Sequence, residues 1–150
     1  MHTSTRKSAA ADATRPEAGA EVCVPVGSEH DLVAARQKGR QLAESLGFSS
    51  SEATLVATAI SELARNIVNY AVRGEIVLRR VHERARRGIT VIARDEGPGI
   101  ANLKLALQEG YSTSGGLGLG LPGVRRIMDE FCIESAPGRG TTVTATKWRL

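Results

Sequence analysis

Apolar residues recur at helical spacing between residues 53 and 67 of this chain, and polar residues occupy the positions between them. This 3.6-residue period predicts an amphipathic helix. Ser49, followed three residues later by Glu52, forms a capping box that starts the helix, and we expect it to end near Tyr70. The apolar face holds Ala53, Val56, Ala57, Ile60, Leu63, Ala64 and Ile67, and the opposite face holds Thr58, Glu62, Arg65, Asn66 and Asn69.

A second helix is predicted directly before this one. Ser28 and Asp31 repeat the capping pattern, the helix runs to about Leu46, and Gly47 fits its C-terminal cap. A short strand, Glu21–Val26, precedes it. Residues 1–20 are rich in Ala, Ser and Thr without periodicity and are interpreted as a disordered tail, which leaves 21–150 as one domain.

The remaining segments alternate between strand and helix patterns. The predicted elements are strands Glu75–His82 and Ile89–Asp95 joined by a basic turn (Glu83–Gly88), a short helix Leu103–Glu109, a loop Gly110–Gly120, a helix from Pro122 to about Glu130, and a hairpin of Phe131–Ser135 and Thr141–Trp148. This order predicts an α/β (α+β) two-layer sandwich, a mixed β-sheet with helices on one face.

Composition narrows the class of protein only slightly. A length of 150 residues suits one domain, and only 3% of them are aromatic, so Ala, Val, Leu and Ile must build the core. The net charge of +4 is concentrated between Arg79 and Arg87 without aromatic residues for base stacking. We therefore favour a solvated hairpin tip over a nucleic-acid surface.

Cys23 and Cys132 lie in apolar, strand-like stretches without the spacing of a zinc site. We expect two small buried side chains in a reducing cytoplasm. No apolar run reaches the roughly 20 residues of a membrane span, and the N-terminus lacks the apolar core of a signal peptide. The sequence therefore predicts a cytoplasmic protein without a membrane partner.

Three motifs carry candidate chemistry. Glu62 and Asn66 are four residues apart, so they share a helix face, where a carboxylate can accept a proton and an amide oxygen can bind Mg²⁺. Asp95-Glu-Gly-Pro-Gly99 ends a strand, and its carboxylate can accept a hydrogen bond from an exocyclic amine such as that of adenine. Taken alone, a solvated helix face and an ordinary turn explain these two motifs equally well or better.

The third motif is the glycine-rich stretch Ser112-Thr-Ser-Gly-Gly-Leu-Gly-Leu-Gly120. Its glycines allow backbone N–H groups to surround an anion just before a helix begins. Leu117 and Leu119 argue against a flexible linker. No GxxxxGK[ST] motif occurs, no strand precedes Gly118 as a dinucleotide-binding fold requires, and the HRD and DFG motifs of eukaryotic-type kinases are missing.

Together the motifs resemble those of the GHKL ATPase superfamily, which has the Bergerat ATP-binding fold. Glu62–Asn66 resembles its N box, Asp95–Gly99 and Gly116–Gly120 resemble its first two glycine boxes, and Gly140-Thr141 resembles its third. The resemblance covers residues 21–149. Within the superfamily the wording is most similar to the small bacterial serine kinases of the RsbW, SpoIIAB and RsbT group, and most of all to the RsbT branch, the switch kinases of the stressosome.

The resemblance implies ATP and Mg²⁺ as cofactors and a role for each matching residue. Glu62 resembles the catalytic base, Asn66 the metal ligand and Asp95 the acceptor of the adenine amine. Gly97 and Gly99 would shape the base pocket, and Thr141 would reach adenine through water. The remaining residues resemble the ATP lid: Ser112, Thr113, Ser114, Gly115, Gly116, Leu117, Gly118, Leu119 and Gly120.

The resemblance also implies a biological setting, namely phosphorylation of Ser or Thr on STAS-domain partners in stress-response partner switching. After release the kinase would activate a downstream regulator such as a PP2C-type phosphatase, as a monomer or a homodimer. The alternative is an anti-sigma factor that mainly sequesters a sigma factor. A histidine-kinase ATP-binding half is less favoured, because no dimerising helix with a phosphoacceptor His precedes the motifs.

Overall fold

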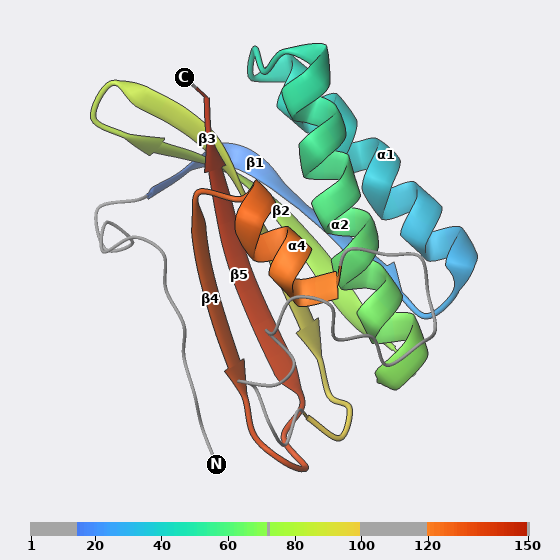
Figure 1. Cartoon of the computed structure of the whole chain (residues 1–150). Helices are drawn as coiled ribbons and strands as arrows, with labels where there is room; N and C mark the ends of the chain where they lie inside the picture. Colours follow the sequence, from blue (N-terminus) through green and yellow to red (C-terminus); the bar gives the residue numbers. More distant parts are fainter. Residues whose placement is uncertain (1–14, 72, 100–119, 150) are drawn as a thin grey trace.

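The computed structural model describes residues 15–71, 73–99 and 120–149, with the backbone alone for residues 15–20. Five strands form one sheet in the order β1-β2-β3-β5-β4. Among the described residues, three helices accompany the sheet (Figure 1). The elements are β1 (Arg15–Val26), α1 (Glu29–Ser45), α2 (Ser50–Tyr70), β2 (Gly74–Glu83), β3 (Arg86–Asp95), α4 (Gly120–Ile127), β4 (Glu130–Ser135) and β5 (Thr141–Trp148).

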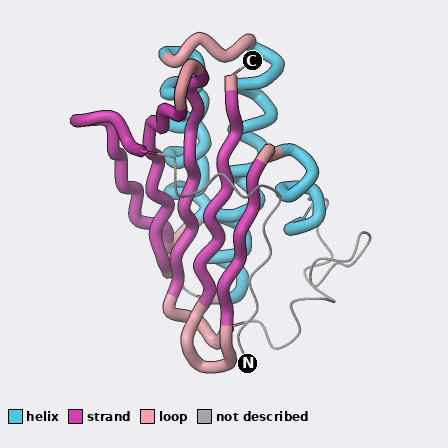
Figure 2. Tube along the Cα trace, turned by 90° about the vertical axis from the view of Figure 1, so that its left-hand side faces the viewer, coloured by secondary structure: helices cyan, strands magenta, loops and turns pink. Residues whose placement is uncertain are grey.

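All three described helices lie on one face of the sheet. Figure 2 shows the strands in front and the helices behind them. The predicted two-layer α/β class is therefore confirmed. One detail of the prediction differs, because each of the four strand pairs is antiparallel where a mixed sheet was expected.

The capping pattern placed both long helices correctly. The Ser28 hydroxyl accepts a hydrogen bond from the Asp31 backbone N–H at 3.3 Å. The Ser49 hydroxyl accepts one from the Glu52 N–H at 3.1 Å. Gly47 adopts a φ of 90° just after α1, a conformation that favours glycine.

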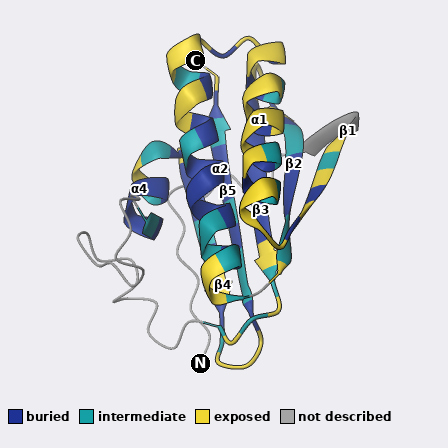
Figure 3. Ribbon diagram, turned by 90° about the vertical axis from the view of Figure 1, so that its right-hand side faces the viewer, coloured by how far each residue is buried: buried dark blue, intermediate teal, exposed yellow. Residues whose placement is uncertain are grey.

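Helix α2 is the central helix of the layer, lying between α1 and α4 with the sheet beneath it (Figures 1 and 3). Its middle turns are buried while both ends are exposed (Figure 3). Large side chains that are fully buried between helices and sheet include Leu32, Ile60, Leu63, Ile67, Ile76, Leu78, Ile89, Phe131 and Ile133. This core fixes the position of α2, which carries two of the candidate site residues.

The prediction that both cysteines are buried is wrong. Cys23 is exposed and Cys132 half-buried, and neither is in a disulfide. Side chains alternate between the two faces of a strand. Since Val24 on β1 and Phe131 and Ile133 on β4 point into the core, the cysteines point to the other face. There the Cys23 thiol donates to Glu75 at 2.9 Å, and this carboxylate raises the pKa of the thiol.

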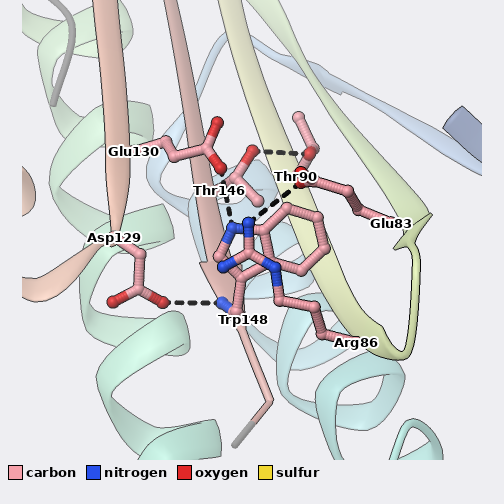
Figure 4. Close-up of polar contacts among 7 residues, drawn as sticks. All are labelled: Glu83, Arg86, Thr90, Asp129, Glu130, Thr146 and Trp148. Carbon is pink, nitrogen blue, oxygen red and sulfur yellow. Dashed lines mark hydrogen bonds and ion pairs between the residues drawn. The ribbon is translucent and has the colours of Figure 1, made fainter. Parts of the chain in front are cut away.

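The β2–β3 hairpin is tighter than predicted. Only Arg84 and Ala85 form the turn, because Arg84 adopts a left-handed φ of 55° and the ladder continues to the Glu83–Arg86 pair. Figure 4 shows how this end of the sheet is fixed. The Arg86 guanidinium lies 4.1 Å from the centre of the Trp148 ring, whose indole N–H donates to Glu130 at 2.7 Å.

Other boundaries differ by a few residues. β1 begins at Arg15, six residues before the predicted strand, with an irregular register between Pro16 and Glu21. α4 starts at Gly120 rather than Pro122 and ends at Ile127, because Asp129 turns to bond Thr146 and β4 begins at Glu130. The predicted helix Leu103–Glu109 and most of the loop Gly110–Gly120 lie outside the described residues. No helix in the described ranges is both long enough and apolar enough to cross a membrane.

Candidate nucleotide site

Asp95 is the last residue of β3, and it lies at the end of the sheet where β5 begins. It pairs with Thr141 in the β3–β5 ladder. One carboxylate oxygen accepts from the Gly97 N–H at 2.9 Å. Partial burial raises the pKa of Asp95, and hydrogen bonds from the Gly97 and Thr141 backbone act in the opposite direction. The structure therefore brings together three of the predicted site residues, Asp95, Gly97 and Thr141, around a half-buried acceptor.

Glycines in this region allow backbone segments to pack closely against one another. A Cβ on Gly97 would lie 2.7 Å from the Ala71 Cβ at the end of α2. At Gly99, with φ 79°, a Cβ would collide with the Ala136 carbonyl, and at Gly140, with φ 78°, with the Asp95 carbonyl. We expected Gly97 and Gly99 to shape the base pocket. In the structure they fit the loop 95–99 between α2 and the β4–β5 turn, which fixes the shape of the loop, and their contact with a ligand stays a prediction.

The β4–β5 turn is tied to the same loop. The Gly138 N–H donates to the Pro98 carbonyl at 2.7 Å. The buried Ser135 hydroxyl donates to the Gly140 carbonyl at 3.0 Å and lies 2.8 Å from the Thr141 hydroxyl. Ser135 was not predicted from the sequence, because a Ser at the end of a strand forms no distinctive pattern. It contributes to holding Thr141 beside Asp95.

Glu62 lies on the polar face of α2, yet only 7% of it is exposed. The reason is α4, which packs against this face of α2. One Glu62 carboxylate oxygen accepts from the Gly120 N–H, the first residue of α4, at 3.2 Å. The positive end of the α4 dipole and this N–H compensate the buried charge.

Arg65 supplies the second contact of this carboxylate. Its guanidinium donates to the other Glu62 oxygen at 3.2 Å, and 35% of its side chain is exposed. From the sequence, Arg65 was interpreted as a solvated polar residue. A contact between residues three apart indicates a site only where its partner is buried, and the sequence did not show that Glu62 is buried. Asn69, interpreted in the same way, is exposed.

Asn66 lies one turn beyond Glu62 and is half-buried. Among the described residues no group of three or more His, Cys, Asp or Glu gathers to hold a metal ion. The Asn66 amide offers one oxygen, and Mg²⁺ commonly binds one or two protein oxygens and completes its shell with phosphates and water.

Of the predicted glycine-rich stretch, Gly120 is described. It has a φ of 66° and opens α4 in contact with Glu62. Ser112, Thr113, Ser114, Gly115, Gly116, Leu117, Gly118 and Leu119 lie outside the described residues and stay a prediction.

Comparison with known proteins places this geometry in a family. The model of the histidine kinase-like ATPase domain matches residues 27–147. The serine/threonine-protein kinase RsbT of Bacillus subtilis (strain 168) is 51% identical over 126 residues, which are 84% of this chain and 95% of that relative. An anti-sigma F factor of Caldanaerobacter subterraneus subsp. tengcongensis is 32% identical over 97 residues, covering 62% of this chain and 68% of the relative.

Solved structures agree on the fold. A crystal structure of the RsbU and RsbW domains of a Mycobacterium tuberculosis protein aligns with a TM-score of 0.57 at 21% identity, over 87% of this chain and 33% of that one. The mycobacterial sensor histidine kinase MprB aligns with a TM-score of 0.51 at 17% identity, over 85% of this chain and 97% of that one. The chain belongs to the histidine kinase-like ATPase domain family and, within it, to the group of small bacterial serine/threonine kinases that includes RsbT.

Proposed function

We propose that this protein transfers the γ-phosphoryl group of Mg-ATP to a Ser or Thr hydroxyl of STAS-domain partners. The observation that carries the proposal is the setting of Glu62. It is a buried carboxylate at the first turn of α4, one helical turn before Asn66, on the helix whose end packs against the Asp95 loop. A buried carboxylate of any role needs donors, so what favours a catalytic role is its place beside Asn66 and near the Asp95 loop.

The proposed roles follow from the chemistry of each group. Asp95 accepts a hydrogen bond from the adenine amine, and Thr141, held by Ser135, lies beside it. Glu62 takes the proton of the attacking hydroxyl, as a positioned general base does. Asn66 would hold Mg²⁺, which neutralises phosphate charge when bound. Phosphoryl transfer depends mainly on such positioning and charge compensation.

The glycine-rich stretch completes the proposed site. Residues Ser112–Gly120 supply hydroxyl and backbone N–H donors to the phosphates, and α4 begins where they end. In the proposed pathway the released kinase then activates a downstream regulator, such as a PP2C-type phosphatase. The RsbT relative supports the phosphoryl transfer step by its name as a serine/threonine-protein kinase.

The test is transfer of label from γ-labelled ATP to a purified STAS-domain protein from the same genome. We expect Mg²⁺-dependent labelling of a single Ser or Thr, located by mass spectrometry. Binding of Mg-ATP without labelling of any STAS-domain protein of that genome would contradict the kinase function.

A second candidate is an anti-sigma factor that acts mainly by sequestration. Four relatives between 31% and 32% identical are anti-sigma F factors, which favours keeping it. This function predicts a stable complex with a sigma factor in the presence of Mg-ATP. A pull-down with the tagged protein distinguishes the two by whether a sigma factor or a STAS-domain protein is recovered.

A further inference from the structure

The Glu62 carboxylate is held by two donors that approach different oxygens. Gly120 N–H contacts one oxygen, and the Arg65 guanidinium contacts the other, each at 3.2 Å. Two contacts on separate oxygens fix the plane of a carboxylate, which one contact leaves free to rotate. A carboxylate has about four lone-pair directions, so two remain to accept a proton.

The two donors differ in how firmly they are themselves held. Gly120 belongs to the backbone of α4, which packs against α2. Arg65 is a side chain about one third exposed on α2. Its geometry alone resembles an ordinary surface ion pair between residues three apart, which contributes little to helix stability.

The same chain offers a matched pair without a candidate function. Arg86 donates to Glu83 at 3.0 Å, again three residues apart, with the same 9% exposure of the Glu side chain (Figure 4). The Glu83–Arg86 pair joins the two sides of the hairpin turn and is fixed by Trp148. The Glu62–Arg65 pair instead includes Glu62, the residue proposed to take the substrate proton.

We propose that Arg65 is a positioning residue for phosphoryl transfer, which orients the Glu62 carboxylate toward the attacking hydroxyl through the Arg65–Glu62 hydrogen bond. This inference rests on the proposed function of Glu62. Arg65 acts through Glu62 and contributes to the rate of the chemical step rather than to ATP affinity. An orienting contact of this kind is expected to matter because small displacements of a catalytic group cost as much as about 100-fold in rate.

The experiment measures kcat and KM for Mg-ATP with a STAS-domain acceptor, and ATP affinity by calorimetry, for Arg65→Ala, Arg65→Lys, Glu62→Gln and the double variant Glu62→Gln/Arg65→Ala. Arg65→Ala should lower kcat about 10-fold to 100-fold with KM for ATP within twofold. Arg65→Lys, which can still donate, should recover part of the loss. Arg86→Ala, the matched control, should leave kcat unchanged.

The double variant separates positioning from other roles. If Arg65 acts only through Glu62, its removal in the Glu62→Gln background causes no further loss. Multiplying effects, or a fall in ATP affinity equal to the fall in kcat, would overturn the inference and indicate direct contact with phosphate. Wild-type kcat in Arg65→Ala would also overturn it, whereas wild-type kcat in Glu62→Gln would remove the proposed base itself. Circular dichroism of each variant identifies any loss of folding, in which case Arg65→Lys carries the test.

Discussion

The candidate site has two halves, one on a helix and one at the end of the sheet. The helix half consists of Glu62 and Asn66 on α2, and its central carboxylate is buried beneath α4. The sheet half consists of Asp95, Gly97 and Thr141, and its carboxylate is half-buried at the end of the β3–β5 ladder. The two carboxylates therefore have different surroundings, and we expect different functions from them.

The difference is clearest in what each carboxylate contacts. Glu62 faces a guanidinium and a helix N-terminus, a setting that holds a charged group in one orientation. Asp95 accepts from the backbone of its own turn and of the neighbouring strand. We infer that the Glu62 carboxylate of the helix half determines the rate of the chemical step and that the Asp95 carboxylate of the sheet half determines affinity for the nucleotide.

Glu62→Gln gives the largest expected effect and tests the role of the helix half in the chemical step. Glutamine keeps the size of the side chain and can still accept from the Gly120 N–H, but it cannot take a proton from a hydroxyl. Loss of a general base typically lowers the rate by about 10²–10⁴. We expect that loss in label transfer, with near-normal Mg-ATP affinity by calorimetry. A variant that loses ATP binding and the fold together would make Glu62 a structural residue.

Asp95→Asn should show the opposite behaviour. Removing the charged acceptor of an adenine amine costs about 1.5–3 kcal/mol, or roughly 10- to 100-fold in ATP affinity. Calorimetric titration of the folded variant with Mg-ATP measures this loss. Unchanged ATP affinity would exclude Asp95 as the adenine acceptor.

The same variant also tests the environment of Asp95 through pH. Since folding raises the pKa of Asp95, its protonated form stabilises the fold, and this stabilisation is lost as the pH rises through the raised pKa. At pH 7 the ionised carboxylate therefore opposes folding. Ligand-free Asp95→Asn should melt no lower than the wild type at pH 7, with the difference shrinking in acid. A clearly lower melting temperature at pH 7 would show that the backbone hydrogen bonds to Asp95 outweigh its burial.

How much could be predicted also differs between the halves. Local patterns located α1 and α2, because Ser28 and Ser49 cap their own helices through contacts three residues away. The arrangement of the sheet half follows from short-range order, since Asp95 and its glycines form one turn and Thr141 starts an adjacent strand, while the roles of these residues stay predictions.

The helix half depends on contacts between segments far apart in sequence. The burial of Glu62 comes from α4, 58 residues further along the chain, and no helical period within α2 reports it. The contact between Arg65 and Glu62 was not predicted for the same reason, because the sequence did not show that Glu62 is buried. The cysteines were misplaced because an apolar neighbourhood does not reveal which face of a strand a residue occupies.

Asn66→Ala should have a smaller effect, and it tests whether this residue of the helix half contributes to ATP affinity. It removes the proposed metal ligand, and a water molecule can take the vacant position, as Mg²⁺ commonly keeps several waters. We expect a loss of about tenfold, near 1.4 kcal/mol, in ATP affinity measured with Mg²⁺. Affinity measured in EDTA should stay at the wild-type value. An equal loss in both conditions would assign Asn66 to contact with the nucleotide instead.

Gly97→Ala gives the smallest expected effect and tests whether the sheet half depends on its close packing. The added Cβ would lie 2.7 Å from the Ala71 Cβ, so the loop must move away from α2 and carry with it the N–H that bonds Asp95. Overpacking of this kind costs about 1–3 kcal/mol of stability. We expect a lower melting temperature and a severalfold weaker ATP affinity, with kcat at saturating ATP unchanged.

Gly138→Ala is the control, because its Cβ would meet nothing within 4 Å although its φ of 78° strains any side chain. It should lower stability by about 1–2 kcal/mol without weakening ATP binding. If both variants weaken ATP binding equally, general strain at this end of the sheet, rather than the position of Asp95, limits affinity. If Gly97→Ala lowers kcat as Glu62→Gln does, the sheet half also controls the chemical step, and the proposed division between the halves fails.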